Sequence, residues 1–167
     1  MKKLNRGLSN ITDLLSSQGV NILVIAVVMA LAGLAYYMFN TTTEVSLLST
    51  VMNETRNLRS SDGYGTDDYI PAIIKGGNIA KSYTVTNGHI YNKYGGLVTS
   101  NGNGVGFIVS DTQLPQGQCL KIAKALGTAD LLSTQINSTT FTGEVTGADA
   151  ASACVDGNNT LTFTTRS

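Results

Sequence analysis

The sequence predicts an α+β protein in which a long N-terminal α-helix packs on an antiparallel β-sheet domain. Three observations predict this fold class. An uncharged apolar run covers residues 20–39, an amphipathic pattern follows it, and short apolar segments separated by Gly, Asn, Asp and Ser fill the rest of the 167 residues. The first two patterns are typical of helices and the third of strands joined by turns. We therefore expect one compact domain with an appendage.

The apolar run (VNILVIAVVMALAGLAYYMF) has Asn21 as its only strongly polar side chain. A helix of about 20 residues spans about 30 Å, the thickness of the hydrocarbon core of a bilayer. Basic residues precede the run and Glu44 is the first charged residue after it, so the positive-inside rule places the N-terminus in the cytoplasm and the residues after Asn40 across the membrane. A cleaved secretory signal and an inert single-pass anchor are alternatives, and the apolar run continues past the A-x-A-like site at residues 30–32, as a retained anchor would.

The helix is expected to continue as one element from about Leu8 to Arg59, roughly 75 Å long. Its second half is predicted to be amphipathic, with Glu44 among the polar positions and a stop signal at residues 60–63 (SSDG). The first half is apolar on all sides and needs lipid or other copies of the chain to shield it from water. The apolar stripe of the second half consists of Val45, Leu48, Met52, Thr55 and Leu58.

The C-terminal part of the chain has three clear local signals. Asn87-Gly88 between two short apolar segments predicts a two-residue β-hairpin. Helical spacing predicts a helix over residues 118–126 with Gly127 at its C-terminal cap. Residues 160–165 (TLTFTT) alternate as a half-buried strand.

Two other segments are less regular. Residues 70–74 are expected to form a packed loop or one helical turn, and residues 95–106 (GGLVTSNGNGVG) a glycine-rich connection into an apolar segment at 107–109. The expected order of the globular part, residues 61–167, is several antiparallel strands, a short helix and a final strand.

Two cysteines, Cys119 and Cys154, lie 35 residues apart, outside any CxxC pair and far from the single histidine, His89. Two thiols and one imidazole make a structural zinc site improbable. A disulfide is the simpler interpretation if the domain is exported, whereas two free cysteines are expected in a cytosolic domain. The disulfide is expected to join the 118–126 helix to the final strand.

The composition excludes several function classes. Eleven basic and eleven acidic side chains cancel, so the net charge does not indicate direct nucleic-acid binding. Residues 102–106 (GNGVG) lack dinucleotide-loop spacing, and the acidic residues near residue 67 lack the spacing of a calcium loop. We expect no catalytic residue, no metal ion and no cofactor, and hence no enzyme.

The whole arrangement resembles the type IVb prepilins, the group that contains the bundle-forming and toxin-coregulated pilins and the thin-pilus pilins of conjugative plasmids. A short basic leader ends in Gly7, and LSNIT, the apolar helix, its amphipathic continuation and a two-cysteine domain follow. The C-terminal motifs are most similar to the thin-pilus type. They are FIV at 107–109, QCLKI at 118–122, ASAC at 151–154 and the 160–165 strand, in that order.

The resemblance implies processing by a dedicated prepilin peptidase, which cuts after a glycine, and methylation of the new N-terminus. Carried over, the cut falls between Gly7 and Leu8, which gives a leader of residues 1–7 and a mature helix over 8–60. A cut between Gly19 and Val20, with a leader of residues 1–19, is the alternative, because residues 16–19 (SSQG) interrupt the apolar helix. An uncut chain is the third possibility.

The resemblance also implies an assembly core in the first half of the helix, where Val27 and Leu31 pack against neighbouring subunits. Family members carry a glutamate at the fifth mature position, which here is Thr12, with Asp13 one place later, or Val24 after the alternative cut. That glutamate is thought to pair with a neighbour's N-terminal amine. Its absence points to a minor pilin or an unusual core, in which Asp13 substitutes.

By this resemblance the chain is a structural subunit, and the major one, of a pilus used for adhesion, cell aggregation or conjugative mating. The expected partners are other copies of the chain in a helical filament, the prepilin peptidase, the assembly machinery, and the inner membrane before assembly. The expected location is then the bacterial surface. A minor pilin or type II secretion pseudopilin, and a membrane-anchored extracellular binding domain that never polymerises, are the alternatives.

Overall fold

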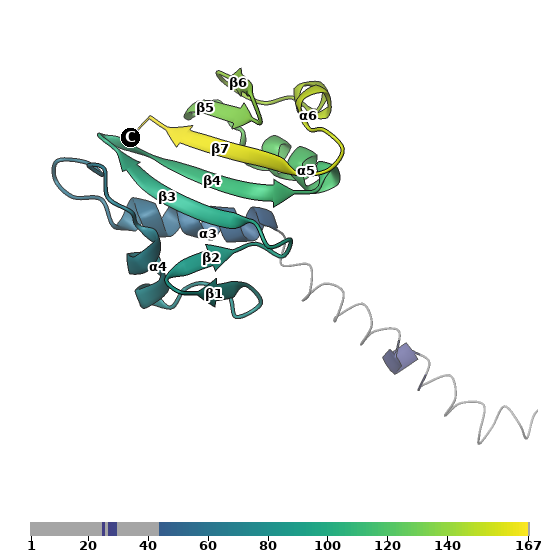
Figure 1. The fold of residues 1–167 in the computed structure, drawn as a ribbon, viewed down its shortest axis with the longest axis horizontal. Coiled ribbons are helices and arrows are strands. Elements are labelled where there is room, and N and C mark those ends of the chain that lie inside the picture. The colour runs from purple at the N-terminus through teal and green to yellow at the C-terminus, as the bar shows by residue number, and fades with distance from the viewer. Residues whose placement is uncertain (1–24, 26, 30–43, 167) are drawn as a thin grey trace, which may run out of the picture. The chain divides into compact units, whose positions relative to one another are not determined.

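The computed structural model describes residues 25, 27–29 and 44–166 (Figure 1). The chain divides into two compact units, Met1–Thr41 and Thr42–Ser167. In the first unit the described residues are helical and their side chains are exposed. Most of the first half of the predicted long helix, including most of the apolar run, lies outside the described residues. Within the described part of the chain, no helix has the length and apolar character needed to cross a membrane.

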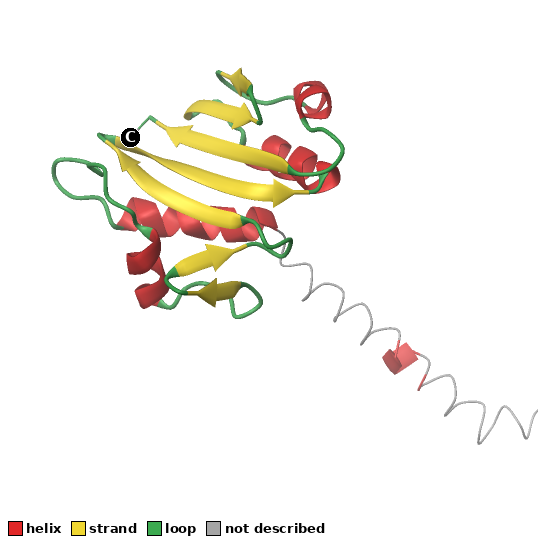
Figure 2. Cartoon of the chain, in the orientation of Figure 1, coloured by secondary structure: helices red, strands yellow, loops and turns green. Residues whose placement is uncertain are grey.

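The second unit is α+β, as predicted, with seven strands in one antiparallel sheet (Figure 2). The order across the sheet is β1-β2-β3-β4-β7-β5-β6, so β7 is inserted between two strands that precede it in the chain. The strands are β1 (Thr84–Thr86), β2 (His89–Tyr91), β3 (Leu97–Asn103), β4 (Gly106–Leu114), β5 (Leu131–Ile136), β6 (Thr139–Phe141) and β7 (Asn159–Thr165).

The predicted hairpin at Asn87-Gly88 is confirmed. Both residues have positive φ, 53° and 78°, and they join β1 to β2, as expected of a turn whose twist matches the flanking strands. The 95–106 segment was expected to be a connection, and that prediction is wrong for most of it, because β3 occupies Leu97–Asn103 and pairs with β4. A glycine is needed at position 102 because the backbone of Tyr64 lies close to it. A Cβ on Gly102 would collide with the carbonyl oxygen of Tyr64.

Four helices accompany the sheet. The 70–74 segment forms a short helix, and the predicted 118–126 helix is confirmed and begins two residues earlier. Gly127 caps it, with its N–H donating to the Ala123 carbonyl. Helices α3 and α5 contact each other. Helix α3 also contacts β4 and helix α5 contacts β7, so both helices cover the same face of the sheet. The helices are α3 (Glu44–Asn57), α4 (Ile70–Gly76), α5 (Gln116–Leu126) and α6 (Gly147–Ala153).

The buried face of α3 differs from the predicted stripe. Leu48, Met52 and Thr55 are buried as expected, but Leu58 lies beyond the end of the helix and is 40% exposed. Glu44, assigned to the polar side, is only 2% exposed, and Leu47 and Val51 complete the buried face. The spacing of apolar residues does not predict this, because the buried side of the helix begins with an acid.

Three elements between α5 and β7 were not predicted: β5, β6 and α6. Thr134 is fully buried on β5, so the strand does not show the apolar alternation that marks a half-buried strand. Helix α6 is short and consists of small residues after its glycine. Its first turn is fixed by a capping box, in which the Thr146 hydroxyl accepts from the Asp149 N–H and the Asp149 carboxylate accepts from the Thr146 N–H.

The core lies between the sheet and the two long helices of this unit, α3 and α5. Alternate residues of β4 and β7 point into it, which is the two-residue period expected of strands with one covered face. The largest fully buried side chains are Phe107, Phe163, Leu47, Leu48, Ile70, Ile73, Ile90, Leu114, Ile122, Ile136, Leu161 and Glu44.

Candidate functional site

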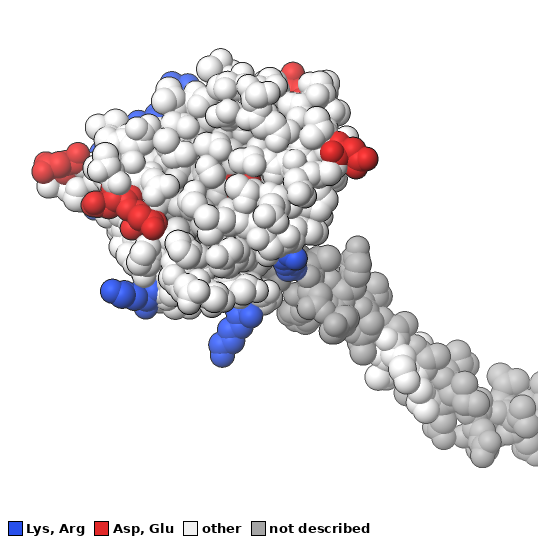
Figure 3. Space-filling model, in the orientation of Figure 1, with Lys and Arg blue, Asp and Glu red and all other residues white. Residues whose placement is uncertain are grey.

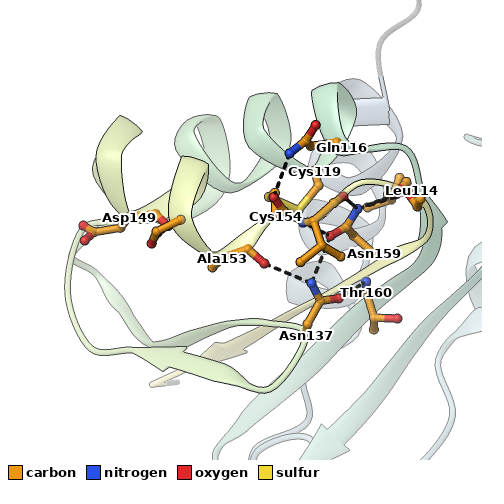
Figure 4. Close-up of a disulfide and its surroundings, with 12 residues drawn as sticks. Leu114, Gln116, Cys119, Asn137, Asp149, Ala153, Cys154, Asn159 and Thr160 are labelled. Carbon is orange, nitrogen blue, oxygen red and sulfur yellow. Dashed lines mark hydrogen bonds between the residues drawn. A yellow bond between two sulfur atoms is a disulfide. The ribbon is translucent and has the colours of Figure 1, made fainter.

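Cys119 and Cys154 form a disulfide, with their sulfurs 2.03 Å apart and their Cα atoms 5.9 Å apart (Figure 4). Cys119 lies on α5, and Cys154 is the residue that ends α6. Both are buried. The bridge therefore fastens α6 to α5. The expectation that it ties α5 to the final strand is wrong, because the unpredicted α6 precedes that strand.

The link to the final strand is made by Asn159, the first residue of β7, which is 1% exposed. Its Oδ1 accepts from the Val155 N–H at 2.8 Å and from the Asn137 side-chain amide at 2.9 Å. Its Nδ2 donates to the carbonyl oxygens of Leu114 at 3.0 Å, Val155 at 2.9 Å and Gly157 at 3.2 Å (Figure 4). One side chain thus joins the end of β4, the loop after α6 and the start of β7.

Asn137, in the turn between β5 and β6, extends this network. Its Nδ2 also donates to the Ala153 carbonyl at 3.0 Å, and its Oδ1 accepts from the Thr160 N–H at 3.0 Å. Gln116 adds a further link by donating to the Cys154 carbonyl at 3.1 Å. The disulfide and three side-chain amides therefore hold the 119–154 region against the rest of the sheet.

Asn159→Asp is expected to lower the free energy of unfolding by about 1–3 kcal/mol, because a carboxylate would face three carbonyl oxygens that now accept from an N–H. Asn158→Asp is the matched control, since its side chain is exposed. Urea unfolding with the disulfide intact measures the difference. Equal unfolding midpoints for the two variants would show that the hydrogen bonds of the Asn159 side-chain amide do not stabilise the fold.

A second buried polar cluster lies at the first turn of α3. Glu44 is 2% exposed and Asp111, on β4, is fully buried. The Lys93 N–H donates to Glu44 Oε1 at 3.2 Å, and the neighbouring Asn92 side chain donates to Asp111 Oδ1 at 2.7 Å. The second oxygens of the two carboxyls, Glu44 Oε2 and Asp111 Oδ2, have no hydrogen-bond partner.

The environment of this cluster favours neutral groups. Burial raises the pKa of Asp111 to about 7, and the charge of Glu44 adds to the rise, whereas the hydrogen bond from Asn92 opposes it. Burial also raises the pKa of Glu44, against the hydrogen bond from the Lys93 N–H and the Lys93 charge. The pKa of Tyr83 is raised by burial and then by the charges of Glu44 and Asp111.

Asn92 organises the turn between β2 and β3 that carries these donors. Its Oδ1 accepts from the N–H groups of Tyr94 and Gly96, each at 2.8 Å, and its Nδ2 donates to the Thr112 carbonyl at 2.7 Å as well as to Asp111. Gly96 has no room for a Cβ, which would collide with the Thr112 carbonyl oxygen. The position of both donors is therefore fixed by a tight turn.

On the face of the second unit that Figure 3 shows, there is no strong concentration of charge. In the view of Figure 3 the middle of the molecule is almost free of charged side chains, and Lys, Arg, Asp and Glu lie around its margin. The described residues contain no group of three or more His, Cys, Asp or Glu side chains that could hold a metal ion.

Of the residues predicted for processing and assembly, Val27 alone is described. It is helical and 54% exposed. The predictions for the others stay predictions, because these residues lie outside the described part of the chain: Gly7, Leu8, Thr12, Asp13, Gly19, Val20, Val24 and Leu31.

Sequence reasoning missed the polar residues of both clusters, although two of them carry a local signal. Asp111 has the same parity on β4 as the buried Phe107 and Val109. Asn159 likewise has the parity of the inward residues of β7. A polar residue at an inward position of a strand is expected to be hydrogen-bonded in the core. Asn92 and Asn137 lie in turns and carry no such signal.

The comparisons with known proteins agree with this architecture. A family model described as PilS N terminal matches residues 38–166, which include α3, all seven strands and both cysteines. No match was found among curated proteins or among solved structures. Because the match covers most of the chain, the chain belongs to the PilS N-terminal family of type IV pilins, subunits of pili of the plasmid thin-pilus type.

Proposed function

We propose that the chain is the major subunit of a type IVb-like pilus, assembled into an extracellular filament through its apolar N-terminal segment. The family match over residues 38–166 is the observation that carries this proposal. The apolar run at residues 20–39 supports it, because an uncharged helix of that length is stable only in lipid or against other copies of itself. Each apolar side chain buried in the filament contributes about 1.5–3 kcal/mol.

The proposed life cycle begins in the inner membrane, with the second unit across it. A prepilin peptidase cuts between Gly7 and Leu8, or else between Gly19 and Val20, and the new N-terminus is methylated. The pilus assembly machinery then extracts the helix and stacks it, with an assembly core at Thr12, Asp13, Val24, Val27 and Leu31. The filament serves adhesion, cell aggregation or conjugative mating.

Mass spectrometry of the assembled protein is expected to find a mature N-terminus at Leu8, or failing that at Val20, with one added methyl group. Replacing Gly7 by a bulkier residue should leave unprocessed precursor in the membrane if the first site is used, and the same change at Gly19 is the matched comparison. An intact Met1, or a start at Gly33, would contradict processing by a prepilin peptidase.

Electron microscopy and protein quantification of sheared surface material test the proposed role. The expected result is filaments in which this chain is the predominant protein. The missing glutamate at the fifth mature position favours a minor pilin or pseudopilin as the second candidate, and that role would be indicated if the chain were a small fraction of the filament protein. Chain that remains in the membrane without filaments would indicate a non-polymerising anchored domain.

A further inference from the structure

Glu44 and Asp111 reach the same short turn from two different elements, the first turn of α3 and the middle of β4. Consecutive residues of that turn, Asn92 and Lys93, hold one carboxyl each, at 2.7 Å and 3.2 Å. The two acids are separated by 67 residues in sequence, yet they meet at adjacent donors. This arrangement brings two buried carboxyl groups to one turn, near enough for the charge of Glu44 to raise the pKa of Asp111.

Two buried carboxylates are costly when both are ionised. Each of these groups has one oxygen with a donor and one without, and both are almost fully enclosed. An ionised carboxyl accepts hydrogen bonds only, so two ionised groups leave both free oxygens unsatisfied and repel each other. A single proton removes one of the two charges and turns one of the unsatisfied acceptors into a donor.

We propose that Glu44 and Asp111 hold one proton between them and thereby form a fastening, lost as the pH rises, between the first turn of α3 and the turn that joins β2 to β3. The proton is the ligand of this site. When it is bound, only one of the two carboxyls is charged and α3 is held at its N-terminal end. When it leaves, two like charges lie together in the core and the contact weakens.

The groups around the pair act on it in opposite directions. The Lys93 charge and N–H stabilise ionised Glu44, and the Asn92 amide stabilises ionised Asp111. Burial and then the Glu44 charge raise the pKa values of Tyr83, from the loop between α4 and β1, and Tyr94, from the turn, so both phenols are neutral beside the pair. Burial outweighs the stabilising contacts at Asp111, whose pKa is about 7.

The sign of the pH dependence follows from this shift. Asp111 has a higher pKa in the folded chain than its ordinary value of 3.8, so the folded state binds the proton more tightly than the unfolded state. The stability that this proton confers is fully present below about pH 4 and is lost as the pH rises through about 7. The unfolding equilibrium constant of the chain should therefore increase on the order of a hundredfold between about pH 5 and pH 8.

Urea unfolding of the full-length chain in detergent micelles at these two pH values tests the fastening. Asp111→Asn keeps the shape and removes the titration of Asp111, so its unfolding constant should change with pH much less than that of the parent chain. Asp67→Asn, in an exposed loop, and Glu54→Gln, on the same helix as Glu44, are the matched controls and should behave like the parent chain. The Lys93 amide should exchange more slowly at the lower pH, after correction for intrinsic exchange, in the parent chain but not in Asp111→Asn.

Side-chain carbon NMR titrations test whether the proton is shared. In Glu44→Gln the titration of Asp111 should move to lower pH, and in Asp111→Asn the titration of Glu44 should do the same, because coupling between two sites is reciprocal. An Asp111 titration unchanged by Glu44→Gln would overturn the shared proton. A parent chain whose stability does not change with pH, or an Asp111→Asn chain with the pH dependence of the parent, would overturn the fastening itself.

Discussion

Val27→Asp is expected to abolish filaments while leaving the second unit folded. In the proposed filament the 20–39 helix is surrounded by other apolar helices, and an ionised carboxylate there has neither water nor a partner, which costs far more than one apolar contact contributes. Leu31→Asp should have the same effect, because residues four apart lie on the same side of the helix that the sequence predicts for 20–39. Electron microscopy of sheared material and immunoblots of the cell surface measure the loss.

The control for this substitution introduces the same charge on the second unit. Val105 is 61% exposed in the turn between β3 and β4, so Val105→Asp should leave its stability unchanged. Val27→Leu should preserve filaments, since it changes the shape of the side chain but adds no charge. Normal filaments from the Val27→Asp chain would show that this segment is not the core of the polymer.

Cys154→Ser is expected to lower the free energy of unfolding by about 2–5 kcal/mol. The disulfide closes a segment of 35 residues that contains β5, β6 and α6, and on the chain-entropy model a loop of this size contributes roughly 3–4 kcal/mol. Serine adds a hydroxyl at a site that is 2% exposed and leaves a free thiol at Cys119, which is fully buried. The loss should reduce pilus yield through degradation, with membrane insertion unaffected.

Urea unfolding of the purified chain measures this change, and a double replacement by alanine separates loss of the bridge from burial of a hydroxyl. Thiol labelling of the unfolded native protein tests the bridge directly. Two free thiols in the absence of reductant would contradict both the bridge and the oxidising compartment inferred from it.

The elements that the sequence predicted are those with strong local signals. Asn87-Gly88 specifies its own turn, and α5 shows helical spacing of apolar residues and ends at a glycine. The strand at the C-terminal end of the described region alternates clearly, with Leu161 and Phe163 inward. In each case neighbours in sequence determine the conformation, so no knowledge of the tertiary structure was needed.

The elements that were missed depend on partners far away in sequence. Strand β5 pairs with β7, and one of its buried positions is Thr134. Because this inward residue is polar, β5 lacks the alternation of apolar and polar residues that predicts a strand. Helix α6 relies on its cap and on the bridge to α5. Glu44 is buried beside a donor from the turn between β2 and β3, the Lys93 N–H, and its charge acts on Asp111 of β4; no property of α3 alone reveals this.

Residues near the C-terminal end of the described region complete the sheet, which imposes an order on folding as the chain is synthesised. Strand β5 pairs with β6 and β7, so the β5–β6 hairpin has no place on the sheet until residues 159–165 have emerged. Cys154 emerges before those residues. The disulfide between α5 and α6 can therefore form before β7 has joined the sheet. It shortens the loop between β4 and β7 that must close when β7 pairs with β4 and β5.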